Sequence, residues 1–240
     1  MTGLIVTLLV ICGSVLAIGL FALVLLSLVV STAVGGLARA SITPVELDES
    51  GEDWKCASTH HDWADGHGFE WLDSFAFVAK GNQPAVILAW RRPATGTYFC
   101  VYRVQPPNLP VVTAYGLVTI IDEVTAVTTS SSRDALSLPQ PNGAYSESLP
   151  DLSLDARLAA HDQSVRYVCD SLGVKPEPPE MAFEELFVNA LKRQAVHVRS
   201  HALWQFRLLY WHSQRMKKVG NAIRERYPDL SRQRRMVALR

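Results

Sequence analysis

The stretch AVILAWRRPATGTYFCVYRV, residues 85–104, decides the fold class. Two runs rich in β-branched and aromatic residues flank the short turn RPATG, and this arrangement is typical of a β-hairpin. Side chains alternate between the two faces of a strand, so Tyr98 and Cys100 share one face while Phe99 takes the other. We therefore expect Cys100 to be a packed thiol between aromatic neighbours.

The same pattern continues on both sides of this hairpin. EWLDSFAFVA (residues 70–79) precedes it, and VTAYGLVTIID (112–122) and VTAVTTS (124–130) follow it. Short connections between strand-like runs indicate antiparallel neighbours. The sequence therefore predicts an antiparallel β meander of about four to six strands. A loop rich in Ser and Pro, from Ser130 to Pro150, is expected to close the meander.

The second half of the chain has helical periodicity. An apolar stripe recurs every three or four residues and predicts a helix that ends at Gly173. Its members are Leu154, Leu158, His161, Val165, Val168 and Leu172. His161 lies inside the stripe, so we expect a hydrogen-bonded core histidine there. Between Pro179 and Gly220 there is no Gly or Pro, which predicts one long helix. Strands followed by helices predict an α+β fold, with the C-terminal helices packed on the sheet.

The N-terminal region is apolar, with no charged residue from Thr2 to Ala38. A membrane core needs about 20 apolar residues in a helix, so the run predicts a transmembrane helix. A cleaved signal peptide is the alternative, since an A-x-A site occurs at residues 38–40. The run has no basic residues before it and exceeds the length of a signal peptide, which favours an uncleaved signal anchor.

Four segments follow from these patterns. They are a transmembrane helix at residues 1–38, an acidic linker at 39–53, an α+β soluble domain at 54–191 and a basic helical segment at 192–240. Arg39 and Lys55 follow the apolar run, and basic residues favour the cytoplasmic side. The three cysteines of the soluble part form no disulfide-like pattern, which favours a reducing compartment. We therefore predict a single-pass membrane protein with a cytoplasmic domain.

The charges are separated along the chain. Lys and Arg number 23, as do Asp and Glu. From Lys192 onward, thirteen basic residues stand against Glu225 and Asp229, a net charge of +11, so the first 191 residues carry −11. This asymmetry indicates a basic segment with an anionic partner, although a solvated helix face would give the same pattern.

Aromatic residues crowd residues 204–211 and basic residues follow them in the most informative part of the basic segment, LWQFRLLYWHSQRMKK (residues 203–218). Such a helix suits the surface of a lipid bilayer with anionic lipid, or an acidic protein partner. The candidate contact residues are Trp204, Arg207, Trp211, Arg215, Lys217 and Lys218. The alternative is a core helix whose tryptophans pack on the sheet. A membrane anchor would make nucleic acid an unsuitable partner.

Two groups of side chains could bind a metal ion. The first is Cys56, His60 and His67, and the second is His197 and His201. A thiolate with two imidazoles suits zinc, and the histidine pair has the i, i+4 spacing of helical zinc ligands. The first spacing matches no standard zinc signature, and Val198 stands where a zinc peptidase has its glutamate base. We therefore expect polar helices at both places and no metal or other cofactor.

The function expected from the sequence is non-catalytic. Phosphate-binding loops, nucleophile elbows and C-x-x-C pairs are absent from the sequence, and these motifs mark common enzyme classes. We therefore expect a membrane-anchored interaction or scaffold module that uses the basic aromatic helix. The alternative is a metal-dependent, membrane-associated enzyme that uses the cysteine and histidine clusters.

Overall fold

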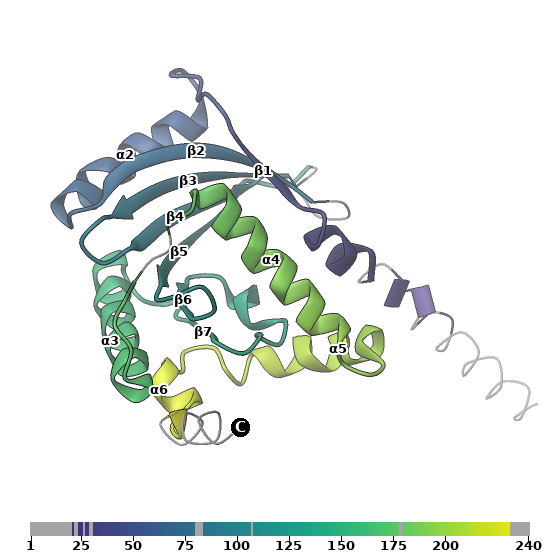
Figure 1. Cartoon of the computed structure of the whole chain (residues 1–240). Coiled ribbons are helices and arrows are strands. Elements are labelled where there is room, and N and C mark those ends of the chain that lie inside the picture. Colours follow the sequence, from purple (N-terminus) through teal and green to yellow (C-terminus); the bar gives the residue numbers. More distant parts are fainter. Residues whose placement is uncertain are drawn as a thin grey trace, which may run out of the picture.

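The computed structural model describes residue 21 and residues 24–25, 27–28, 31–79, 84–106, 108–177 and 180–230. Within these residues the chain forms an α+β fold around one mixed, seven-stranded sheet (Figure 1). The predicted α+β class is therefore confirmed, while the details of the sheet and of the N-terminal segment are corrected below.

The strands follow one another in the sheet in their order along the chain. They are β1 (Ser41–Pro44), β2 (Glu70–Val78), β3 (Ala85–Arg92), β4 (Thr97–Val104), β5 (Val112–Ile120), β6 (Ala126–Ser130) and β7 (Ala144–Ser148). Neighbouring strands are antiparallel from β1 to β6, as predicted, but β7 pairs with β6 in parallel. A parallel neighbour requires a crossover, which residues 131–143 provide.

Two strands lie where the sequence predicted none. β1 falls inside the predicted acidic linker, and β7 falls inside the predicted loop from Ser130 to Pro150. The antiparallel meander of four to six strands is therefore corrected to a seven-stranded mixed sheet. β7 has the sequence AYSES, and its Ser146, Glu147 and Ser148 are buried. Buried polar strand residues resemble a loop in sequence, because strand patterns are recognised by apolar side chains.

The helices are α2 (Glu52–Gly66), α3 (Leu154–Leu172), α4 (Phe183–Arg199), α5 (Trp204–Arg215) and the single turn α6 (Ile223–Arg226). α3 occupies the predicted span: the Ser153 side chain caps its N-terminus, and Gly173 ends it with φ 64°. The long helix predicted up to Gly220 is broken between α4 and α5, where Leu203 has φ 55°.

Helices cover both faces of the sheet. On one face, α2 and α3 pack Ala64 and Leu158 against Trp90 and Phe99. On the other face, α4 packs Phe183 against Phe75 and Tyr98, with ring centroids 5.1 and 5.2 Å apart. Figure 1 shows α4 crossing this second face of the sheet. Side chains of β4 alternate between the two faces of the sheet, so Phe99 packs in the first core and Tyr98 in the second.

The N-terminal helix contradicts the predicted membrane anchor. Within the described part of the chain, no helix is both long enough and apolar enough to cross a membrane. This finding corrects the predicted transmembrane helix at residues 1–38, together with the single-pass membrane location and the cytoplasmic placement derived from it. Residues 1–20, 22–23, 26 and 29–30 of that prediction lie outside the described residues.

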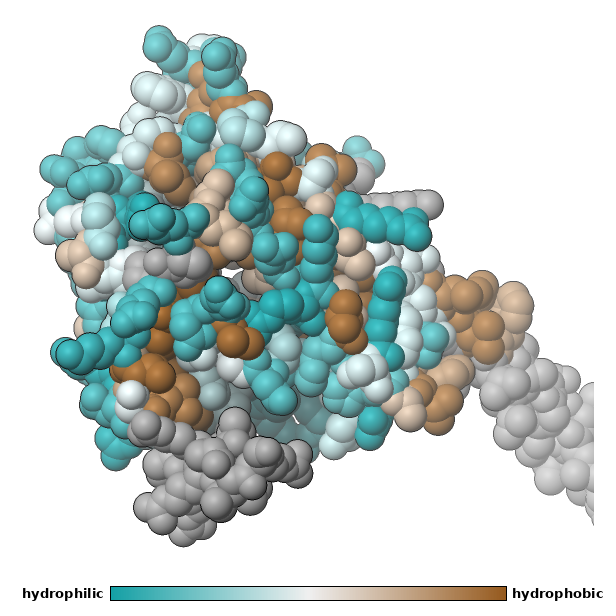
Figure 2. All heavy atoms as spheres, in the orientation of Figure 1, coloured by the Kyte–Doolittle hydropathy of each residue, from teal (hydrophilic) through white to brown (hydrophobic). Residues whose placement is uncertain are grey.

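The described end of the apolar run belongs to the protein core. Residues 31–37 are helical, and Val34 is 2% exposed in a cluster with Ala195, Val198 and Leu208. Their apolar character is therefore explained by packing against α4 and α5. Further toward the N-terminus the helix exposes Phe21, Val24, Leu25 and Leu28. In the space-filling view of Figure 2, hydrophobic residues gather on the side where the N-terminal segment leaves the domain.

Gly143, just before β7, provides a test of the crossover. It has φ 85°, and a Cβ there would lie 2.6 Å from the carbonyl oxygen of Val124. Gly143→Ala is expected to lower the free energy of unfolding by about 1–3 kcal/mol through backbone strain and crowding. Gly66→Ala is the control, because a Cβ at Gly66 meets nothing within 4 Å. Equal melting temperatures for the two variants would contradict this placement of the crossover.

Candidate functional site

A cleft of about 1070 Å³ lies beside β7. Three groups of residues form its walls: residues 138–145, which lead into β7; Leu172 and Val174 at the end of α3; and Lys218, Arg226 and Tyr227. Val124 and Thr125, from the turn before β6, complete it. Cavities of this size that combine an apolar lining with a few polar groups are typical of ligand sites.

The charge in this cleft is positive. Lys218 and Arg226 both line it, and none of the described lining residues is Asp, Glu, His or Cys. Burial, and then the neighbouring Arg226, lower the pKa of Lys218. Lys218 has no ion pair or side-chain hydrogen bond with any residue in the described part of the chain. Two adjacent cations of which one is unpaired suit an anionic ligand.

Arg226 is held in place by its neighbours. Its Nη1 donates to the carbonyl oxygen of Ser146 in β7, and its guanidinium lies 5.3 Å from the centre of the Tyr227 ring. Tyr227 in turn meets Tyr145 edge to face, with ring centroids 5.3 Å apart. The two tyrosines thus give the cleft an aromatic wall next to its cations.

Glu147, buried behind the cleft, fixes the helical turn that carries Arg226. Its carboxylate is fully enclosed and accepts hydrogen bonds from the Thr129 hydroxyl at 2.7 Å and the Ser164 hydroxyl at 2.9 Å. The backbone N–H of Ile223, the first residue of α6, donates to it at 2.8 Å. Burial raises the pKa of Glu147, while these donors and Arg226 act against that rise. The carboxylate therefore ties β7 to α6 from inside the domain.

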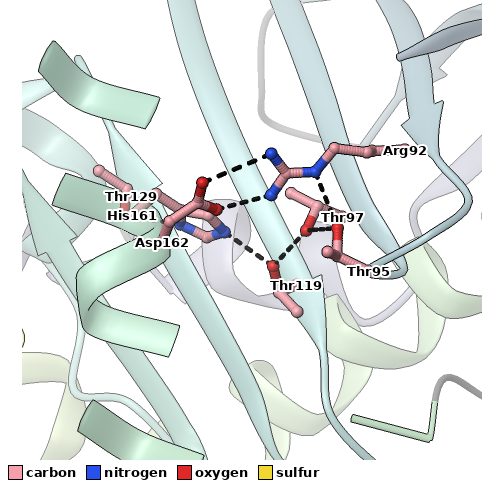
Figure 3. Close-up of polar contacts among 7 residues, drawn as sticks. All are labelled: Arg92, Thr95, Thr97, Thr119, Thr129, His161 and Asp162. Atoms are coloured by element: carbon pink, nitrogen blue, oxygen red, sulfur yellow. Dashed lines mark hydrogen bonds and ion pairs between the residues drawn. The ribbon is translucent and has the colours of Figure 1, made fainter. Parts of the chain in front are cut away.

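A chain of hydrogen bonds runs from Glu147 across the strands, on the face of the sheet that α3 covers. His161 bonds Thr129 through Nδ1 and Thr119 through Nε2, each at 2.8 Å. Thr119, Thr97 and Thr95 continue the chain at 2.8 Å per step. Nε of Arg92 donates to Thr95 at 2.8 Å, and the guanidinium pairs with Asp162 at 2.6 Å. Figure 3 shows this path from Arg92 to Thr129 through the domain.

Only one arrangement of protons along these hydrogen bonds is consistent with Arg92 as a donor at one end and Glu147 as an acceptor at the other. Thr129 gives its single hydroxyl proton to Glu147, so Nδ1 of His161 must donate to Thr129 and Nε2 must accept from Thr119. Arg92 can only donate. Every donor therefore points from the cation Arg92 toward the carboxylate of Glu147.

His161 is a structural residue in this chain. It is 0% exposed, and burial, against which nearby Asp162 acts, lowers its pKa to about 3. The imidazole is therefore neutral at neutral pH and has both nitrogens occupied by threonines. This confirms the core histidine predicted from the apolar stripe.

The candidate metal-binding residues lie in ordinary helical contacts. Sγ of Cys56 is 3.8 Å from Nδ1 of His60, and that nitrogen also lies 2.7 Å from the carbonyl oxygen of Cys56. His67 contacts Asp155 at 3.3 Å instead. The rings of His197 and His201 are 4.8 Å apart, and Nδ1 of His201 bonds the carbonyl of His197. Among the described residues, no group of three His, Cys, Asp or Glu side chains could hold a metal ion.

The structure divides the predicted contact residues into two sets. Trp204 and Trp211 are half-buried against the core cluster of Val34, and Arg215 pairs with Asp134 at 2.8 Å. Arg207 and Lys217 remain exposed, while Lys218 turns out to line the cleft. Contact of this segment with an acidic partner or an anionic surface stays a prediction. The two tryptophans pack against the core cluster, so they are not free to anchor it.

Sequence reasoning missed most of the cleft. The local sequence does not point to Arg226, Tyr145 and Tyr227, because β7 has the polar, loop-like sequence AYSES and α6 is a single turn. The basic charge of residues 192–240 was the one signal in the sequence that pointed to Lys218 and Arg226. Comparison of the chain with known protein families, with curated proteins and with solved structures gave no match.

Proposed function

We propose that this protein is a non-catalytic binding module whose cleft holds an amphipathic anion. The anionic head, a carboxylate or phosphate, would lie between Lys218 and Arg226, and an apolar body would lie along the walls. One observation carries the proposal: Lys218, which has no ion-pair partner among the described residues, stands beside Arg226 in a cleft whose described lining contains no carboxylate.

Electrostatics favours an anion in this position. Arg226 acts on Lys218 as a like charge, and burial removes water from the ammonium group. Both effects disfavour the charged form of a lysine. An anion placed between the two cations would reverse the first effect, so binding should raise the pKa of Lys218.

The lining also suggests the body of the ligand. Apolar residues outnumber polar ones on the walls, and they include Val124, Leu138, Leu172 and Val174. Each buried methylene contributes about 0.8 kcal/mol, which is about a fourfold gain in affinity. Affinity for linear carboxylates should therefore rise with chain length until the cleft is filled.

The described groups in the cleft support binding in preference to catalysis. General acid–base chemistry uses His most often, and also Asp, Glu, Cys, Lys or Tyr. Of these, only Lys218, Tyr145 and Tyr227 are in the described lining of the cleft, with no carboxylate, imidazole or thiol beside them to form an acid–base pair. Glu147 and His161 are both 0% exposed and have their polar atoms bonded inside the domain. These two residues hold the strands and helices around the cleft in place, and their side chains do not face a ligand.

The test compares two adjacent lysines in the full chain. Lys218 lines the cleft, whereas Lys217 is exposed and does not. Lys218→Met is expected to weaken decanoate binding about 10-fold to 100-fold, because a hydrogen bond to a charged group contributes about 1.5–3 kcal/mol. Lys217→Met should bind as the parent does. Isothermal titration calorimetry measures both.

Three ligands with the same decyl chain make the result specific. Decanoate and decyl phosphate should bind, and their relative affinity shows which head group the cleft prefers. Decyltrimethylammonium should not bind, because two cations face it. Equal binding of all three, or an equal effect of the two lysine substitutions, would show that the cleft does not select anions.

A further inference from the structure

A second candidate site lies at the other end of the sheet, around two exposed tryptophans. Trp54, in the first turn of α2, is 42% exposed, and Trp71, near the start of β2, is 37% exposed. Both line two adjoining grooves, one shared with residues 44–47 and the other with the next turns of α2. Large aromatic side chains exposed together in a groove suit a binding site.

Carboxylates surround these tryptophans. Glu46 and Asp73 line the first groove and Asp62 lines the second, while neither described lining contains Lys or Arg. Asp73 accepts a hydrogen bond from the N–H of Ser74. None of the three acids forms an ion pair with any residue that the structure describes.

This combination fits a guanidinium group. Arginine stacks on the face of tryptophan through a cation–π contact, and its planar fork donates to carboxylates in pairs. A compact ammonium ion would use the charge but less of the aromatic surface. The chemistry of the grooves therefore points to arginine side chains.

The chain itself contains an arginine-rich segment. Residues 231–240 read SRQRRMVALR, with four arginines and no acidic residue. They follow Leu230 and lie outside the described residues. We propose that the groove around Trp54 and Trp71 binds the arginines of this segment from a second copy of the chain.

The backbone at Arg232, Arg234 and Arg235 falls short of the groove of its own copy, so for these three arginines geometry favours a second copy. β2 and β7 are five strand spacings apart, which is about 24 Å at 4.8 Å per step. Leu230 packs near Tyr145 of β7, and Arg232, Arg234 and Arg235 follow within five residues. Five extended residues span at most about 18 Å. Figure 1 shows α2 and α6 at opposite ends of the sheet.

The first experiment uses a labelled peptide of residues 231–240 and the full chain. Fluorescence anisotropy is expected to show binding that weakens as salt is added, because exposed charges are screened. The double variant Asp62→Asn/Asp73→Asn should raise the dissociation constant at least tenfold. Asp65→Asn is the matched control, since Asp65 is exposed on α2 but lines neither groove.

A peptide with its arginines replaced by glutamine should not bind. Absence of binding by the parent peptide, or an equal effect of the double variant and of Asp65→Asn, would overturn the proposal.

The second experiment measures self-association of the full chain by sedimentation. The average mass should rise with protein concentration, and Arg232→Gln/Arg234→Gln/Arg235→Gln should abolish this rise. The triple variant leaves every described residue unchanged, and its melting temperature, compared with that of the parent, shows whether it folds equally well. Association that persists unchanged in the triple variant, or a parent chain that stays monomeric, would overturn the assignment to a second copy.

Discussion

Between pH 6.5 and pH 4, His161 alone is expected to lower the free energy of unfolding by about 3 kcal/mol. Burial lowers its pKa from 6.5 to about 3 in the folded protein. In this pH range the unfolded chain takes up a proton at His161 and the folded chain does not. Protonation therefore favours the unfolded state, and the loss grows as the pH falls toward 3.

Other groups near His161 titrate in the same region, so the test is a difference between two proteins. Glu147 has a raised pKa in the folded state, and its contribution is greatest at low pH and decreases as the pH rises. Asp162 and Arg92 also act on the imidazole. His161→Gln retains a donor and an acceptor but cannot take up this proton. Urea unfolding from pH 7 to pH 4 should show a clearly flatter profile for the variant, and parallel profiles would contradict a buried neutral His161.

Replacement of Phe99 by alanine is expected to lower the free energy of unfolding by about 3–5 kcal/mol, because a large cavity would open in the core. Phe99 is 0% exposed, and its ring centroid lies within 6.5 Å of five aromatic rings. Those rings belong to His60, Trp63, Phe69, Trp90 and Tyr115. The ring therefore joins α2 to β3 and β5, and to Phe69 just before β2.

The control for Phe99→Ala is Tyr210→Ala on α5. Tyr210 is 62% exposed, so its loss should change the free energy of unfolding by less than about 0.5 kcal/mol. Denaturant unfolding monitored by tryptophan fluorescence measures both variants. Similar midpoints for the two would mean that Phe99 does not lie at the centre of this core.

The parts of the fold that the sequence predicted well are those determined by residues close together in the sequence. The hairpin of β3 and β4 follows from alternation and a short turn, and Trp90 pairs with Phe99 across it. α3 follows from its apolar stripe, its cap Ser153 and its terminal Gly173. The stripe of α3 matches the one face that packs on the sheet, whereas the hairpin is covered on both faces.

The parts that sequence missed depend on distant residues. Glu147 can lie in a buried strand because Thr129, Ser164 and Ile223 donate hydrogen bonds to its carboxylate. The local sequence AYSES does not indicate these partners. Val34 is apolar because it packs on α4 and α5. Its place in a long apolar run made the same residue look like part of a membrane helix. The cleft could not be predicted for the same reason, since three remote segments build it.

The strand order has a consequence for the synthesis of the chain on the ribosome. Each strand pairs with the one made just before it, so the sheet can grow in step with translation from β1 to β7. Glu147, however, receives its backbone donor from Ile223, which is made 76 residues later. Until that residue emerges, a buried carboxylate lacks one of its partners. The nascent domain is therefore completed only when the last short turn of helix docks beneath the sheet.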